Sequence, residues 1–184
     1  MIRKVEIKEF EKIYRELIVV DFPKNERRPL LMIKDLFRKG LYFCWVLCDN
    51  EEVSAYACFM QNHDKKSMLL DYFAVAANKR GSGIGSTFLE LLREQLSGGG
   101  VIIECEMPEK ASGEKEAEIR KRRIEFYRRN GAVLSDFGWS AFGVDYKLLW
   151  LPLEDQLSEV KLEEEIKNIY SKAMPSFLAK KLTS

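Results

Sequence analysis

A basic residue followed by three glycines marks the segment Arg80-Gly81-Ser82-Gly83-Ile84-Gly85, which lies between two apolar patterns. Glycine lets backbone N–H groups approach a ligand closely, and the free N–H groups of a helix's first turn attract anions. The apolar run before the turn, 67–75, predicts a strand, and the leucine-rich run after it predicts a helix. A turn of this kind, between a strand and a helix, is suited to hold a phosphate.

Three designs of phosphate-binding turn compete at this position. The nucleoside-triphosphatase loop needs a lysine before its Ser or Thr, and Gly85-Ser86-Thr87 supplies none, which excludes it. The dinucleotide fingerprint would use Gly81 and Gly83, with Ser86 in place of the third glycine and Glu104 ending a strand further on. That fingerprint normally follows the first strand of a parallel unit, whereas several strand-like runs precede this turn. The third design is a pyrophosphate-binding turn found in a protein family that this segment resembles.

The elements that must position the turn alternate between strand and helix patterns. Short polar turns between three successive strands indicate an antiparallel meander, and the pattern becomes α/β after the glycines. The predicted elements are a strand over 2–7, a helix from 9 to about 21, a helix over 30–38, strands over 41–48, 53–61 and 67–75, a helix over 83–96, a strand over 101–106, a charged helix ending at 130–131, and a strand pair over 132–134 and 144–151.

Composition limits the classes of partner. The 184 residues are 46% hydrophobic and 32% charged, and 30 basic against 29 acidic side chains leave a net charge of +1. This balance disfavours a nucleic-acid partner, and no apolar run approaches the length of a membrane span. With no signal-peptide pattern at the N-terminus, we expect a cytoplasmic location. The cysteines have no CxxC or histidine-cluster spacing, so we expect no metal.

The segment from Arg80 to Gly85 resembles the pyrophosphate signature of the GNAT superfamily of coenzyme A-dependent N-acetyltransferases: Arg or Gln, two residues, Gly, one residue, then Gly or Ala. Asp71-Tyr72-Phe73-Ala74-Val75 resembles the family's central strand. Phe126-Tyr127-Arg128-Arg129-Asn130-Gly131-Ala132 resembles a later helix end, where a Tyr precedes Gly by four residues. The resemblance covers 1–151 and implies an α/β fold (a mixed α+β sheet) with about seven strands flanked by helices.

The same resemblance implies acetyl-coenzyme A as the acyl donor and no metal. The main chain from Phe73 through Ala74 to Val75 would hydrogen-bond the donor's thioester arm, with Phe73 and Val75 as donors and acceptors. The implied pyrophosphate-binding residues are Arg80, Gly81, Ser82, Gly83, Ile84, Gly85 and Ser86.

Tyr127 is the expected general acid, again by resemblance. A phenol with a pKa of about 10 stays protonated at neutral pH and can donate to a leaving thiolate; the competing interpretation is a core aromatic. The general base is left open between Asp71, Glu104, Glu106 and a water. Asp71 is notable because an aspartate in an apolar strand is costly unless paired or functional, and Glu104 and Glu106 share one side of their strand. Each carboxylate could instead form a salt bridge.

The predicted function is transfer of an acetyl or other short acyl group from acyl-coenzyme A to a primary amine, by direct attack in a ternary complex. The alternatives are a catalytically inactive coenzyme A-binding regulatory module and a dinucleotide-dependent enzyme. We expect a small-molecule or peptide amine acceptor, bound by 22–28 and the last strand pair. Residues 1–152 form the predicted acyltransferase domain and 153–184 a C-terminal helical extension, in a monomer or homodimer.

Overall fold

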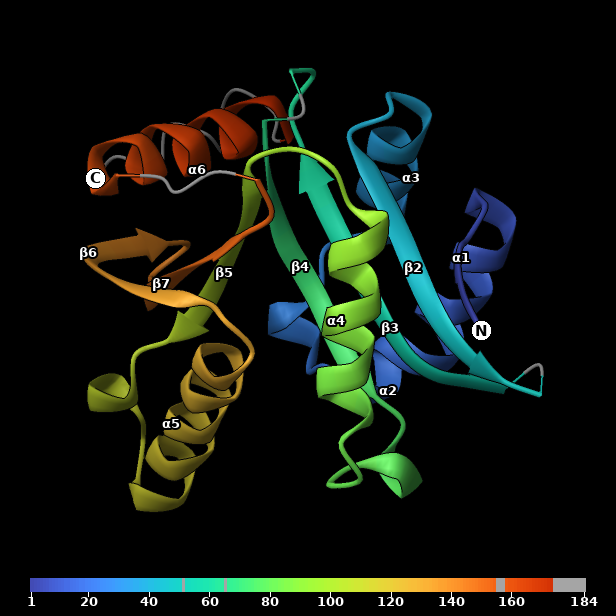
Figure 1. Ribbon diagram of the computed structural model, residues 1–184, viewed down its shortest axis with the longest axis horizontal. Coiled ribbons are helices and arrows are strands. Elements are labelled where there is room, and N and C mark those ends of the chain that lie inside the picture. Colours follow the sequence, from blue (N-terminus) through green and yellow to red (C-terminus); the bar gives the residue numbers. More distant parts are fainter. Residues whose placement is uncertain (51, 65, 155–157, 174–184) are drawn as a thin grey trace. The chain divides into compact units, whose positions relative to one another are not determined.

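Within the described residues (1–50, 52–64, 66–154 and 158–173 of a computed structural model), seven strands follow the order β1-β2-β3-β4-β5-β7-β6 (Figure 1). The backbone groups into two compact units. Unit 1 comprises Met1–His63 and Asp71–Gln95, and unit 2 comprises 64–70 and the chain from Leu96 onward. Strand β4 (Ser67–Val75) contributes its first half to unit 2 and its second half to unit 1. Strands and flanking helices agree with the expected mixed sheet.

The first three strands of unit 1 pair antiparallel with their neighbours, and the second and third of them belong to the predicted meander. Strand β1 (Ile2–Lys4) pairs antiparallel with β2 (Tyr42–Asp49), and β2 pairs antiparallel with β3 (Glu52–Gln61). Strand β4 has a different partner on each face. The Tyr72 ring meets Phe22 at 4.9 Å between centroids, and the Phe73 ring stacks on Phe88 at 5.8 Å. Because successive strand residues face opposite sides, α4 (Ile84–Gln95), which carries Phe88, covers one face, and the segment containing Phe22 covers the other.

The N-terminal elements of unit 1 differ from the prediction in their boundaries. Strand β1 ends at Lys4 instead of 7, because Glu6 is already the N-cap of α1 (Ile7–Ile13). The predicted single helix continues through a π-helical turn over Tyr14–Ile18 into the short α2 (Val19–Asp21). The wider turn keeps Ile18 fully buried while the Tyr14 hydroxyl reaches a later loop. Helix α3 (Leu30–Arg38) has the predicted limits.

Unit 2 is built on β5 (Gly100–Glu106), which pairs parallel with the first half of β4 and antiparallel with β7 (Val144–Pro152). Strand β6 (Val133–Ala141) pairs antiparallel with β7 and runs seven residues past the predicted end at 134. The alternation of apolar and polar residues in β6 is interrupted by polar residues and by a register shift between Leu134 and Gly138. For this reason the sequence pattern did not predict the second part of the strand.

Two longer helices complete unit 2. Helix α5 (Glu114–Arg129) is the predicted charged helix, and it ends one residue before the predicted end at 130–131. The expected helix of the C-terminal extension is present as α6 (Glu159–Ala173). Its apolar face packs on the same chain, because Leu162, Ile166, Ile169 and Tyr170 are all at most 2% exposed.

Candidate active site

The glycine turn in unit 1 has the backbone geometry of an anion-binding loop. Gly81 and Gly83 have φ values of +79° and +85°, which L side chains rarely adopt. A Cβ built on either residue would meet no atom within 4 Å, so the space above this backbone is open. The Thr87 N–H already bonds the Gly83 carbonyl at the start of α4. The N–H groups before Thr87 in the helix's first turn therefore have no intrahelical acceptor, which is the arrangement that binds anions in other proteins.

Side chains around the turn fasten it to its own unit. Arg80 donates from Nε to the Val75 carbonyl and from a terminal nitrogen to Asp21 Oδ1, both at 2.9 Å. Ser82 Oγ donates to the Lys79 carbonyl at 2.6 Å. Lys79 in turn bonds Ser54 Oγ at 2.8 Å. The Arg80 side chain thus links the turn to the end of β4 and to α2, a connection that the signature residue alone did not reveal.

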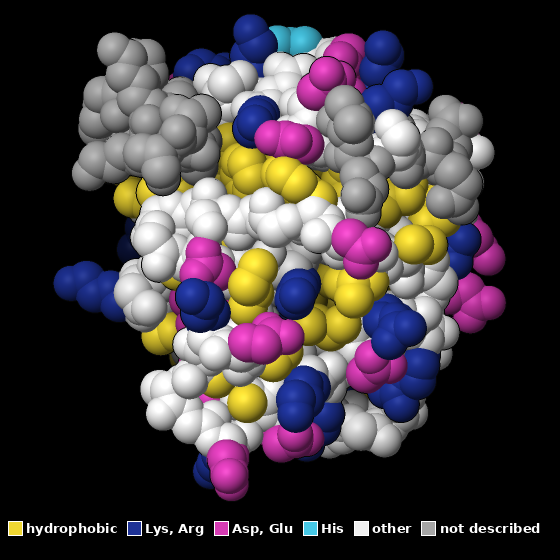
Figure 2. Space-filling view, turned by 90° about the vertical axis from the view of Figure 1, so that its left-hand side faces the viewer, with side chains coloured by type: hydrophobic (Ala, Val, Ile, Leu, Met, Phe, Trp, Pro, Cys, Tyr) yellow, Lys and Arg dark blue, Asp and Glu magenta, His cyan; other side chains and the backbone are white. Residues whose placement is uncertain are grey.

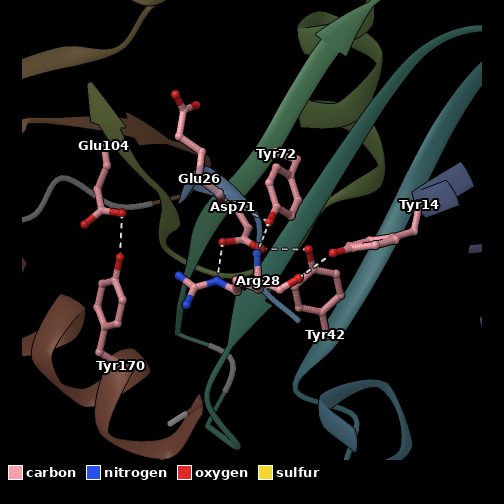
Figure 3. A network of polar contacts seen from close by, with 8 residues as sticks. All are labelled: Tyr14, Glu26, Arg28, Tyr42, Asp71, Tyr72, Glu104 and Tyr170. Carbon is pink, nitrogen blue, oxygen red and sulfur yellow. Dashed lines mark hydrogen bonds and ion pairs between the residues drawn. The ribbon is translucent and has the colours of Figure 1, made fainter. Parts of the chain in front are cut away.

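A buried polar network joins β4 to the loop before α3 (Figure 3). Asp71 Oδ1 lies 2.7 Å from Arg28 Nε, and Asp71 Oδ2 accepts a hydrogen bond from the Tyr42 hydroxyl at 2.8 Å. The side chains of Arg28 and Asp71 are only 14% and 6% exposed. Because both oxygens of Asp71 are engaged, its surroundings favour a positioning role over proton transfer.

The same network fixes the main chain of Arg28 (Figure 3). Its N–H donates to the Tyr72 hydroxyl and its carbonyl accepts from the Tyr14 hydroxyl, each at 2.7 Å. Burial, and secondarily the charge of Asp71, raise the pKa values of Tyr42 and Tyr72 well above the ordinary value. Both phenols therefore stay protonated at neutral pH. The loop expected to bind the acceptor is thus held at Arg28 by three contacts, which involve its N–H, its carbonyl and its guanidinium.

Tyr127 lies near the end of α5 in unit 2 and is 6% exposed. Burial raises its pKa above the ordinary value, the neighbouring Cys105 adds to the rise, and Arg123 opposes it. Its backbone carbonyl accepts the Ala132 N–H at 3.0 Å where the helix ends. The phenol is thus protonated at neutral pH, as a general acid must be.

The two glutamates of β5 have different partners. Glu106 Oε2 lies 3.2 Å from Arg120 Nε, an ion pair without a hydrogen bond at that nitrogen. Glu104 accepts hydrogen bonds from two uncharged donors, Trp139 Nε1 at 2.6 Å and the Tyr170 hydroxyl at 2.7 Å. Of the three carboxylates in the prediction, Asp71 and Glu106 therefore face a guanidinium, whereas Glu104 is bound by a tryptophan and a tyrosine.

Strand β5 separates the expected acid from Glu104. Alternation along the strand turns Cys105 toward α5, where Tyr127 lies, and turns Glu104 toward α6, where Tyr170 lies. Within unit 2, Tyr127 and the Glu104 side chain therefore lie on opposite faces of the same strand.

Several residues of this site were missed by reasoning from the sequence. Arg28 entered the prediction only within the segment 22–28, and Trp139, Tyr42 and Tyr170 had no assigned role. In the described part of the chain, no group of three His, Cys, Asp or Glu side chains could hold a metal ion. Among the described helices, none combines the length and apolarity needed to cross a bilayer.

Solved structures share this fold. A protein described as a GNAT-family acetyltransferase from Bacteroides thetaiotaomicron is 24% identical, covers 90% of this chain and 93% of its own, and superposes with a TM-score of 0.69. The Escherichia coli ribosomal-protein-S18-alanine N-acetyltransferase is 19% identical, with coverages of 86% and 96% and a TM-score of 0.56. The yncA protein of Salmonella typhimurium, described with its cofactor acetyl-CoA, is 16% identical, with coverages of 86% and 96% and a TM-score of 0.57.

At these identities the likeness establishes the fold alone, and no curated protein sequence matches the chain significantly. The family of this chain is identified by the match of its sequence to a family model. The model of the acetyltransferase (GNAT) family matches residues 7–132, which include the glycine turn, Glu104 and Tyr127. This match covers well over half of the chain and confirms the predicted family and enzyme class. The chain belongs to the acetyltransferase (GNAT) family.

Proposed function

We propose that this acetyltransferase moves an acetyl or other short acyl group from acetyl-coenzyme A, or a related acyl-coenzyme A, to a primary amine by direct attack in a ternary complex. The observation that carries the proposal is the glycine turn. Its left-handed Gly81 and Gly83 are open to a ligand directly before the first turn of α4, in a chain that belongs to the family. Backbone N–H groups from Gly81 to Ser86 would bind the pyrophosphate.

The donor's arm would lie along the second half of β4. Phe73, Ala74 and Val75 supply its main-chain partners, and the Val75 carbonyl is shared with Arg80 Nε. Arg80 holds the turn in the conformation that exposes the turn's backbone N–H groups. We therefore assign Arg80 an indirect role in donor binding, because it positions the turn. This chemistry needs no metal, because the thioester is already activated for attack by an amine.

Two proton transfers remain for the chain's side chains. An alkyl ammonium has a pKa near ~10 and must lose a proton before it attacks. This proton would pass to one of the carboxylates Asp71, Glu104 and Glu106 or to a water. Tyr127 would then protonate the departing thiolate.

We propose an acceptor that is a small molecule or a peptide with a free amine, in the cytoplasm, acted on by a monomer or homodimer. The loop from Phe22 to Arg28, fixed by the Asp71 network, would contact it. On the face drawn in Figure 2, basic and acidic side chains are interspersed. A surface of mixed charge favours recognition of the acceptor through a few local contacts. It does not favour electrostatic binding of a polyanion or a polycation.

A thiol-release assay with acetyl-coenzyme A and a panel of amines tests the proposal. We expect release of free coenzyme A that depends on one class of amine, with mass spectrometry showing one acetyl group added to that amine. Calorimetric binding of coenzyme A without release for any amine would favour the inactive regulatory module. Retention of a nicotinamide cofactor through purification would favour the dinucleotide-dependent enzyme.

A further inference from the structure

Arg80, the first residue of the glycine turn, is joined to a buried tyrosine through a single carboxylate. A terminal nitrogen of Arg80 donates to Asp21 Oδ1 at 2.9 Å, and the Tyr56 hydroxyl donates to Asp21 Oδ2, also at 2.9 Å. Asp21 ends α2 and Tyr56 lies on β3, so both belong to unit 1, as the turn does. These three residues, Tyr56, Asp21 and Arg80, form the turn anchor.

The turn anchor runs from the core of unit 1 to its surface. Tyr56 is 2% exposed, whereas the side chains of Asp21 and Arg80 are 18% and 57% exposed. Burial, and secondarily the charge of Asp21, raise the pKa of Tyr56 above its ordinary value, so its hydroxyl remains a donor at neutral pH. A long, exposed arginine side chain is therefore oriented from its inner end by a buried group that keeps its proton.

A second set of contacts joins the same face of β3 to the chain just before the glycines. Ser54 and Tyr56 are two residues apart on β3, so their side chains share one face of the strand. Lys79 Nζ donates to Ser54 Oγ at 2.8 Å, and the Ser54 carbonyl accepts the Ala76 N–H at 2.9 Å. The two residues before the first glycine are thus both tied to β3, Lys79 directly and Arg80 through the turn anchor.

The glycines themselves cannot hold the conformation of the turn. Glycine has more conformational freedom to lose than any other residue, and Gly81 and Gly83 both adopt a left-handed φ directly after Arg80. Ordering a loop during binding lowers affinity, and fixing it beforehand raises affinity. An ion pair with so exposed an arginine contributes little to the stability of a fold. Its main effect is therefore expected on the turn, where Arg80 is held by both Val75 and Asp21.

We propose that Asp21 and Tyr56 are positioning residues for the acyl donor, which act through Arg80 to hold the glycine turn in the conformation that binds the pyrophosphate of coenzyme A. This inference rests on the proposed function for the location of the donor site. Asp21 acts on the turn through Arg80, and Tyr56 acts through Asp21. The charge of Asp21 and its position have opposite effects on binding. By charge alone, removal of a carboxylate strengthens the binding of an anion nearby, whereas loss of the anchor weakens it.

Asp21→Asn in the full chain tests the inference, by calorimetric titration with coenzyme A. Asparagine keeps the size of the side chain and removes the charge that pairs with Arg80. The affinity should fall by about three- to tenfold, because the turn must then be ordered during binding. Tyr56→Phe, which changes no charge, should weaken binding by about threefold. The matched control is Glu11→Ala, which removes the ion pair with Lys34 in the same unit and should leave the affinity within about twofold of the wild type.

A double variant separates positioning from a general effect on the fold. Arg80→Ala removes the residue through which Asp21 acts, so adding Asp21→Asn to Arg80→Ala should weaken coenzyme A binding no further. A merely structural role would lower the melting temperature and leave the affinity of the folded variants unchanged.

Unchanged or stronger binding in a folded Asp21→Asn, unchanged binding in a folded Tyr56→Phe, or a further loss in the double variant overturns the inference and leaves the acyltransferase standing. If the wild type binds no coenzyme A, the proposed function fails and the inference, which rests on it, fails as well.

Discussion

Arg28 and Asp71 are 43 residues apart in the chain, and their Nε and Oδ1 atoms lie 2.7 Å apart in an almost fully buried ion pair. The pair connects the loop expected to contact the acceptor with the strand expected to hold the acyl donor, both within unit 1. Removal of either residue alone should destabilise the fold, because the charge of the remaining residue would be buried without compensation.

Asp71→Asn should therefore destabilise the protein by about 3–5 kcal/mol, the usual effect of removing one partner of a buried pair. Urea denaturation measures the change. Lys121→Ala is the matched control, because Lys121 pairs with Glu118 at a surface where both side chains are at least 60% exposed. That variant should stay within about 0.5 kcal/mol of the wild type. Equal stability of the two variants would contradict the structural role of Asp71.

Gly83→Glu should weaken coenzyme A binding by more than about tenfold, because it puts a negative charge where the pyrophosphate is expected. Gly40→Glu is the control for backbone strain. Gly40 also has a left-handed φ, +69°, and open space around its Cβ position, but it follows α3, away from the turn. Calorimetry that finds the same affinity in both folded variants would remove the glycine turn from the donor site.

Tyr127→Phe keeps the ring and removes the proposed proton donor. The turnover number should fall by about a hundredfold to ten-thousandfold, whereas the KM for acetyl-coenzyme A should change little, because the contact forms in the transition state. Burial raises the pKa of Tyr127, so the acid stays protonated as pH rises and ionisation of Tyr127 should cause no loss of activity up to about pH 10. Turnover within twofold of the wild type, with chemistry rate-limiting, would make Tyr127 a core aromatic.

Thiol labelling offers a check that does not depend on activity. Burial raises the pKa of Cys105 to about 12, so at pH 8 this thiol is protonated as well as inaccessible. Cys48 is the partly exposed cysteine and should react first with iodoacetamide, ahead of Cys44, Cys58 and Cys105. Mass spectrometry of the labelled peptides, native and in denaturant, measures the order. Cys105 labelled natively as fast as Cys48 would contradict the packing of β5.

Ile166→Ala tests whether α6 is part of the folded unit. Ile166 is completely buried, so its truncation should cost about 2–5 kcal/mol. Lys172→Ala, at an exposed position on the same helix, should cost almost nothing. Thermal denaturation followed by circular dichroism compares the two. A negligible effect of Ile166→Ala would mean that the extension is not required by the rest of unit 2.

The local elements were predictable where the pattern was uninterrupted. Strand β4 has the predicted limits, because an apolar run lay between a polar turn and the glycines. Strand β6 was predicted only to 134, since Asp136 and Gly138 break the alternation around its bulge. The predicted motif residues did lie on the expected elements, but their partners were not predictable. Nothing near Glu104 in the sequence points to Tyr170, 66 residues later, because such pairings depend on how distant elements pack.

Trp139 gives the protein an optical reporter of its own. Indole emission responds to charge close to the ring, and the N–H of Trp139 is bonded directly to the Glu104 carboxylate. The chain has three tryptophans, so replacing Trp45 and Trp150 with phenylalanine leaves a single fluorophore at this position. Its spectrum would then report any change in the charge on Glu104.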